Sequence, residues 1–191
     1  MCEVFRDFRI DTARLRLRLF TFEDAEPLNA IISDKRVMKY LPDDFTTREE
    51  IDSLLSWLIK CYTENTIDNI IKFTVAIEYL ETGEFIGWCG FGPLEFDLSE
   101  IELYYSLAKD YWNRGLASEA SIAMLDYGFT TIGLPKLVAV AAPENKASLR
   151  VIEKIGFKFK KQIKGLADEF LSYENDLYFT LTKDEYFAKT D

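Results

Sequence analysis

The fold is decided by a change of pattern within residues 101–119, which read IELYYSLAKDYWNRGLASE. The first half alternates like a strand and carries aromatic and branched side chains, which predicts a β-strand over residues 101–107. The second half leads through small residues into a helix predicted over residues 115–129. Because a further apolar strand is expected at residues 136–142, this stretch predicts a β-α-β crossover.

The residues before the crossover predict an antiparallel meander. Strands are expected at residues 70–80 and 85–91, and turn residues at 81–84 join them into a hairpin. Pro93 is expected to end the second strand, and an acidic stretch, residues 95–100, separates it from the third.

The remaining periodic segments complete the pattern. They are a strand at 14–19, helices at 21–33 and 51–59 (the second preceded by a capping box at 47–50), a helix at 147–155 closed by Gly156, and strands at 157–163 and 177–181. We therefore predict a single α/β domain over residues 1–191. It has a mixed, mostly antiparallel sheet flanked by helices on both faces.

Composition excludes several classes of protein. The 191 residues are 48% hydrophobic and 15% aromatic, which a disordered chain is not. No apolar run approaches the ~20 residues of a membrane span. The net charge of −10 disfavours nucleic acid as a partner and is compatible with a cationic or amine-bearing one. The chain has no histidine, so a Ser-His-Asp triad and imidazole metal sites are excluded.

The cysteines and the first strand carry weaker signals. Cys2, Cys61 and Cys89 are odd in number and form no CxxC, which predicts reduced thiols, a cytoplasmic location and no metal site. The arginines of residues 14–18 alternate with leucines. This pattern indicates either an anion site or a strand face in contact with solvent.

The turn at residues 111–119 is the strongest candidate site. Gly115 and Ala117 are small enough for a ligand to approach the backbone. The first amides of the following helix lack intrahelical partners and lie at the positive end of its dipole, which makes an anion site. Arg114 adds a guanidinium suited to phosphate. This pattern indicates either a cradle for a diphosphate or an ordinary strand-to-helix turn that contains a glycine. The absence of GxxxxGK[ST] and GxGxxG motifs points away from nucleoside triphosphates and NAD.

Residues 102–157 resemble the GNAT N-acetyltransferases, and most closely the Rim-type branch that acetylates the N-termini of ribosomal proteins. The resemblance rests on residues 102–107 (ELYYSL), 111–120 (YWNRGLASEA), 145–148 (NKAS) and 153–157 (EKIGF), and residues 12–18 and 178–182 are similar to the ends of that branch. It implies a GNAT fold and an acyltransferase that uses acetyl-CoA as co-substrate, without a metal.

The resemblance also implies residues that bind the cofactor. Main-chain groups of Leu107 and Ala108 are expected to pair with the pantetheine arm like an added strand, and Asn145 is expected to face that arm. The diphosphate is expected among Trp112, Asn113, Arg114, Gly115, Leu116, Ala117 and Ser118. Trp112 departs from the family, which has arginine or glutamine there, so the amides and Arg114 must carry more of the contact. Asn145 can also serve only as a helix cap.

Two side chains are candidates for the chemistry. Strand alternation puts Glu102 and Tyr104 on one face and Leu103 and Tyr105 on the other. Glu102 matches a glutamate of the Rim-type branch that would remove the proton of the amine. Ser148 matches a serine that would donate to the departing thiolate, because the position of the family's tyrosine falls on Ile152. A backbone N–H near Leu107 is the expected oxyanion donor. The alternative for Glu102 is an ordinary glutamate in contact with solvent. The alternative for Ser148 is a serine that only satisfies backbone amides at the start of its helix.

The expected reaction is transfer of an acetyl group to a primary amine, either a protein or peptide N-terminus or a small amine. Acceptor specificity is expected from residues 33–69 and from the loops near Glu95 and residues 165–174, which are rich in acidic side chains. A homodimer is left open, and no nucleic acid or membrane partner is expected. The alternative is a non-catalytic protein that binds acyl-CoA or another partner on the same fold.

Overall fold

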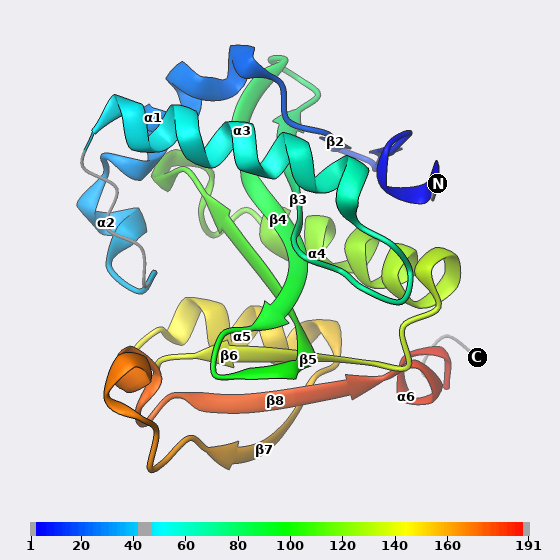
Figure 1. Ribbon diagram of the computed structural model, residues 1–191, viewed down its shortest axis with the longest axis vertical. Helices are drawn as coiled ribbons and strands as arrows, with labels where there is room; N and C mark the ends of the chain where they lie inside the picture. The colour runs from blue at the N-terminus through cyan, green and yellow to red at the C-terminus, as the bar shows by residue number, and fades with distance from the viewer. Residues whose placement is uncertain (1–2, 42–46, 189–191) are drawn as a thin grey trace.

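The computed structural model describes residues 3–41 and 47–188 (Figure 1). Its strands are β1 (Arg9–Asp11), β2 (Leu15–Arg18), β3 (Phe73–Tyr79), β4 (Glu84–Leu94), β5 (Asp97–Leu107), β6 (Lys136–Ala141), β7 (Lys158–Gln162) and β8 (Leu177–Thr182). Its α-helices are α1 (Ala25–Ile32), α2 (Lys35–Met38), α3 (Arg48–Glu64), α4 (Leu116–Asp126), α5 (Lys146–Ile155) and α6 (Lys183–Phe187). Short 3₁₀ turns lie at Glu3–Phe5, Phe22–Asp24, Lys109–Tyr111 and Asp168–Tyr173, and a π-helical turn at Tyr127–Ile132.

The strands form one eight-stranded sheet in the order β1-β2-β3-β4-β5-β6-β8-β7. Neighbouring strands are antiparallel except β5 and β6, which are parallel and joined through α4. The predicted meander is therefore confirmed as β3-β4-β5, and the predicted crossover as β5-α4-β6. The predicted mixed, mostly antiparallel sheet is confirmed as well.

Helices cover both faces of the sheet. α1 packs on α3 and β4, and α4 packs on α5, β2, β4 and β5 on the other side (Figure 1). The helix expected after residues 47–50 is confirmed: the Thr47 hydroxyl accepts from the Glu50 amide at 3.2 Å, and the Glu50 carboxylate accepts from the Thr47 amide at 3.0 Å. The face of α3 that carries Ile51, Leu55 and Leu58 is buried in the core.

Two details of the predicted meander were wrong. β4 continues through Pro93 to Leu94, and β5 already begins at Asp97 within the acidic stretch. Pro93 stands opposite Ile101, and the register shifts directly after it. A proline is tolerated at such an irregularity because the ladder does not need its missing N–H there.

The arginines of β2 keep contact with solvent, with about a quarter of each side chain exposed, and they also pair with acidic side chains. Arg16 and Arg18 both pair with Glu78 on β3 at 3.2 Å, and Arg18 also pairs with the buried Asp24 at 2.7 Å. The polar face of this strand therefore lies against carboxylates of the protein itself.

The described cysteines, Cys61 and Cys89, are buried free thiols, and Cys2 lies outside the described residues. Within residues 3–41 and 47–188, no cluster of acidic, cysteine or histidine side chains is suited to hold a metal ion. None of the helices in these ranges combines the length and apolar character needed to cross a bilayer.

Candidate active site

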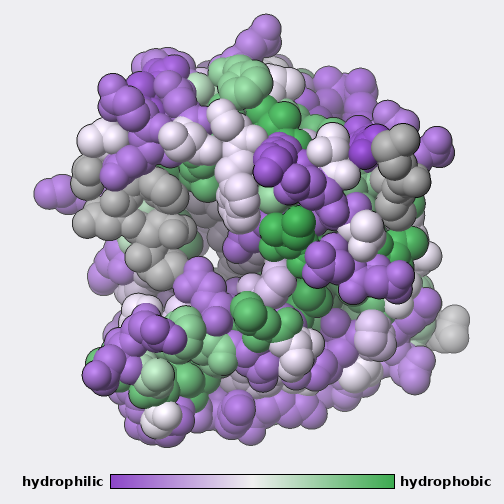
Figure 2. Space-filling model, in the orientation of Figure 1, coloured by the Kyte–Doolittle hydropathy of each residue, from purple (hydrophilic) through white to green (hydrophobic). Residues whose placement is uncertain are grey.

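The two parallel strands open into a fork. Over the full length of β5 and β6, which are both completely described, the register pairs Glu102 with Val138 and no other residues. From this point the strands diverge toward their C-terminal ends (Figure 1). The space-filling view is hollowed in the same region, between the part of the molecule that carries α3 and the part that carries β8 (Figure 2).

The backbone at the end of β5 faces this fork. Leu107 stands opposite Gly87 of β4, and the Ala108 amide donates to the Ile86 carbonyl at 2.8 Å. In an antiparallel ladder, the residue before such a bond turns its own N–H and C=O the other way. The Leu107 N–H therefore points toward the fork, and its carbonyl accepts from Trp112 Nε1 at 2.7 Å. Of the expected main-chain partners of pantetheine, the Leu107 N–H is the group that points there.

Glu102 lies at the closed end of the fork and is partly buried. Burial raises the pKa of its carboxyl to about 7, while the charge of Lys72 and the Val140 backbone N–H act to lower this pKa. Glu95 and Asp176 act as like charges and raise it further. A carboxyl with a pKa near neutrality suits a general base, because it is partly ionised at pH 7 and still basic enough to accept a proton.

Lys72 was not singled out from the sequence. Its ammonium lies 4.4 Å from the ring centre of Tyr104, on the same face of β5 as Glu102. The Tyr104 hydroxyl in turn lies 2.7 Å from the Thr74 hydroxyl of β3. The strand pattern predicted that Glu102 and Tyr104 share a face, but no local signal linked residue 72 to them.

Ser148 lies on the other side of β5, in the first turn of α5. The Asn145 side chain accepts from the Ser148 amide at 3.1 Å, so the expected helix cap is present. The Ser148 hydroxyl accepts from the Tyr105 hydroxyl at 3.2 Å. Sequence reasoning placed Tyr105 on the face opposite Glu102 but did not identify this contact, because it joins residues 43 positions apart.

The turn before α4 has the backbone of an anion cradle. Asn113 and Gly115 adopt positive φ angles of 59° and 77°. Backbone of this kind gathers successive N–H groups around one point. The Glu119 amide bonds to the Gly115 carbonyl at 3.1 Å, so the amides of residues 116–118 precede the first intrahelical bond. A Cβ built on Gly115 would meet Arg14 Nη2 at 3.6 Å.

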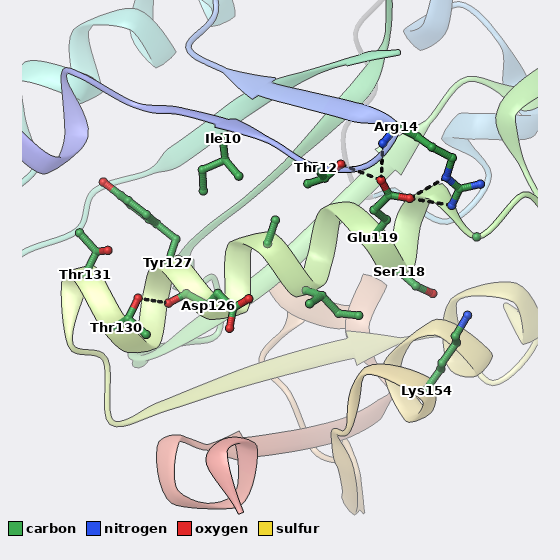
Figure 3. Close-up of a pocket in the computed structure, with 13 residues that line it drawn as sticks. Ile10, Thr12, Arg14, Ser118, Glu119, Asp126, Tyr127, Thr130, Thr131 and Lys154 are labelled. Atoms are coloured by element: carbon green, nitrogen blue, oxygen red, sulfur yellow. Dashed lines mark hydrogen bonds and ion pairs between the residues drawn. The ribbon is translucent and has the colours of Figure 1, made fainter. Parts of the chain in front are cut away.

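Arg114 does not extend over the helix end. Its guanidinium lies 4.9 Å from the ring centre of Tyr79 and 5.2 Å from that of Tyr111, and it donates to the Tyr79 hydroxyl at 2.9 Å. The cation beside the turn is Arg14, which donates to the Arg114 carbonyl at 2.9 Å and pairs with Glu119 at 2.7 Å (Figure 3).

Trp112 packs at the end of β5. Besides the indole bond to Leu107, the Lys109 ammonium lies 4.1 Å from its ring centre. The side chain at the family's arginine or glutamine position therefore holds the strand end in this chain. Leu116 and Ser118 are buried beneath the turn, which anchors the start of α4.

A hollow of about 630 Å³ runs along α4 away from the turn (Figure 3). It is lined by α4, by the β1–β2 segment around Thr12 and Arg14, and by Lys154 of α5, which points toward Ser118. The hollow includes Gly115 but neither Glu102 nor Ser148. It therefore adjoins the cradle and is separate from the fork.

Comparison with known proteins identifies the family to which the chain belongs. The family model described as acetyltransferase (GNAT) domain matches residues 14–158. The chain belongs to the GNAT acetyltransferase family. The predicted family, the fold class and the assignment as an acyltransferase are thus confirmed, and this family uses acetyl-CoA as co-substrate.

Relatives of this GNAT acetyltransferase match it along nearly their whole length. The uncharacterized N-acetyltransferase p20 of Bacillus licheniformis is 32% identical over 180 residues, which cover 92% of this chain and 96% of p20. A GNAT-family acetyltransferase crystal structure from Bacillus anthracis is 27% identical with a TM-score of 0.76, covering 93% of this chain and 99% of that one. Spermidine N-acetyltransferase from Vibrio cholerae, solved with CoA and spermine, shares the fold at 18% identity, with a TM-score of 0.72 and coverage of 92% and 99%.

Proposed function

We propose that this GNAT acetyltransferase moves the acetyl group of acetyl-CoA to a primary amine by direct attack within the fork between β5 and β6. The observation that carries this proposal is the single register pair of the two strands, Glu102 with Val138. Because the strands diverge from that pair, the opening gives access to the Glu102 face and to the Ser148 face of β5.

The residues around the turn suit coenzyme A. The amides of residues 116–118 and the dipole of α4 would hold the diphosphate. The positive φ of Gly115 and the Arg14 guanidinium beside this glycine support that role. The backbone at the end of β5 would lie along the pantetheine arm, which leaves the Leu107 N–H beside the thioester, and Asn145 lies beside Ser148 on the same approach. Arg114 contributes by holding the turn through Tyr79 and Tyr111.

The reaction needs a base on one face and a donor on the other. The amine nitrogen attacks the thioester carbonyl carbon, and Glu102 accepts the amine proton directly or through a water molecule. The Leu107 N–H stabilises the negative charge that develops on the carbonyl oxygen. When the carbon–sulfur bond breaks, its electron pair stays on sulfur and the Ser148 hydroxyl donates a hydrogen bond to the thiolate. An amide and the thiol of CoA are the products.

The acceptor side of the fork is acidic. Glu95 and Asp176 act as like charges on Glu102, and burial with Glu144 raises the pKa of Asp176 to about 6. This environment favours an acceptor with a second positive charge, such as a polyamine or a basic peptide N-terminus. Of the residues expected to choose the acceptor, 42–46 lie outside the described ranges. The cytoplasmic location and the homodimer stay predictions.

An acetylation screen tests the proposal. Release of CoA thiol from acetyl-CoA is followed with N-terminal peptides, polyamines, aminoglycosides and free amino acids, and mass spectrometry identifies the acetylated product. We expect thiol release that depends on the amine and matches the acetyl groups transferred. Binding of acetyl-CoA without release for any amine would support the non-catalytic alternative.

A further inference from the structure

The Tyr105 hydroxyl is the group that fixes the direction of the Ser148 hydroxyl. Tyr105 reaches Ser148 Oγ as a donor at 3.2 Å, and the Ser148 backbone is fixed at the start of α5 by Asn145. A serine hydroxyl has one proton to donate and two lone pairs that accept. Because one lone pair is occupied by Tyr105, the serine proton points elsewhere.

We propose that Tyr105 is a positioning residue for thiolate departure: its hydrogen bond turns the Ser148 proton toward the sulfur of CoA and strengthens it as a donor. This inference rests on the proposed function. The proton of Tyr105 stays on Tyr105 throughout. The sulfur leaves as a thiolate that accepts from Ser148 and later takes a proton from water, while the amine proton goes to Glu102.

Two features of the structure and one general property of hydrogen bonds support this role. Burial raises the pKa of Tyr105 to about 12, although Ser148 acts to lower it, so the phenol stays protonated and remains a donor at neutral pH. Hydrogen bonds in a chain polarise one another, which makes the serine a better donor than it would be alone. The residue at the family's tyrosine position, Ile152, is buried and apolar, so α5 offers no phenol there.

Tyr105 and Glu102 also lie on opposite faces of the same strand. The base that receives the amine proton and the pair that stabilises the sulfur are therefore held by one element, β5.

The test is a double-mutant cycle with Tyr105→Phe and Ser148→Ala. Tyr105→Phe keeps the ring and its packing and removes only the hydroxyl. We expect kcat to fall about 10-fold or more in Ser148→Ala and about 3- to 10-fold in Tyr105→Phe, with unchanged CoA affinity. Because Tyr105 acts through Ser148, the double variant should be no slower than Ser148→Ala. Tyr186→Phe on α6, which loses a phenol hydrogen bond to Asp126 of α4, is the matched control and should keep the wild-type kcat.

A second readout needs no acceptor amine. The ultraviolet absorbance of the thiolate of bound CoA is titrated with pH in the wild type and in each variant. We expect the thiol pKa to be about half a unit to one unit higher in Tyr105→Phe than in the wild type. Without the Tyr105 hydroxyl, Ser148 is a weaker hydrogen-bond donor to the thiolate. Thermal unfolding of each variant checks that the fold persists.

The two readouts separate failure of this inference from failure of the proposed function. If Tyr105→Phe matches the wild type in kcat and in thiol pKa, or if its effect multiplies with that of Ser148→Ala, Tyr105 is a packing residue and the inference is overturned. If the wild type acetylates no amine, the proposed function fails, and the thiol titration still decides whether Tyr105 and Ser148 stabilise the thiolate.

Discussion

Gly92 on β4 lies directly opposite Glu102 on β5, and the space above the glycine is filled by the stem of Lys72. A Cβ built on Gly92 would lie 2.9 Å from Cδ of Lys72, so any other residue would push the lysine away. Residues opposite each other on neighbouring strands share a face of the sheet. Because Gly92 has no side chain, the Lys72 side chain can lie over β4, and its positive charge acts on Glu102.

Lys72→Met is expected to move the pH profile of the reaction. The charge of Lys72 lowers the pKa of Glu102, so its loss raises this pKa above its present value of about 7. Activity that depends on ionised Glu102 then begins at a higher pH, and kcat at pH 7 falls. The measurement is kcat against pH with one saturating acceptor.

Lys72→Arg keeps the charge and is the control for Lys72→Met. The acidic side of its kcat–pH profile should stay within a few tenths of a pH unit of that of the wild type. If the acidic side of the kcat–pH profile does not move in Lys72→Met, Lys72 does not influence the ionisation of Glu102.

Glu102→Gln is expected to lower activity and raise stability. We expect kcat to fall about 10²-fold, because the amine loses its proton acceptor. The folded-state pKa of about 7 lies above the ordinary value of 4.5 for a glutamate carboxyl. The carboxyl therefore contributes stability that is fully present below pH 4.5 and is lost as the pH rises through 7.

The effect of Glu102→Gln on stability follows from the raised pKa of Glu102 in the folded state. Above pH 7 the ionised, partly buried carboxylate costs on the order of 1–3 kcal/mol, and the amide removes this cost. Denaturant unfolding at pH 8 and pH 4 should show the variant more stable than wild type at pH 8 and equal or weaker at pH 4. A variant less stable than wild type at pH 8 would contradict the assigned burial cost.

Gly115→Val is expected to weaken CoA binding by about 10-fold or more, because the new side chain enters the cradle and the positive φ becomes strained. Gly133→Val is the matched control: its φ of 83° imposes the same kind of strain, and a Cβ there meets nothing within 4 Å. Calorimetry of CoA binding compares the two. Equal affinities in both variants would mean that the turn does not hold the diphosphate.

Glu119→Ala tests the support of the turn by the segment between β1 and β2. The carboxylate accepts from the Thr12 hydroxyl at 2.7 Å, the Arg14 amide at 2.8 Å and the Arg14 guanidinium at 2.7 Å. Its loss should destabilise the fold by about 1–3 kcal/mol and raise the KM for acetyl-CoA. Glu153→Ala, on the exposed face of α5, should change neither quantity.

The sequence predicted the elements whose signal is local. The capping box before α3, the turn residues at 81–84 and Gly156 after α5 each occur where the structure has an element boundary. The meander and the crossover follow from the order of these elements. β1 and α6 were missed because they are three and five residues long, which leaves no periodicity to detect.

The candidate site was predicted only as a set of positions. Strand alternation placed Glu102 and Tyr105 on opposite faces, but the partners of these residues come from distant segments: Lys72 precedes β3 directly, and Ser148 lies in α5. Arg114 resembled a phosphate ligand by its place in the motif. Its stacking on Tyr79 depends on the pairing of strands far away in the chain, which no local pattern contains.

The central claim is that acetyl-CoA meets the amine in the fork between β5 and β6, and a crystal structure with bound CoA tests it most directly. We expect the diphosphate on the amides of residues 116–118 and the sulfur between the strands, within hydrogen-bond distance of Ser148 Oγ and near the Leu107 N–H. A CoA molecule seated along the hollow beside α4, with its sulfur away from Glu102 and Ser148, would rule out catalysis in the fork.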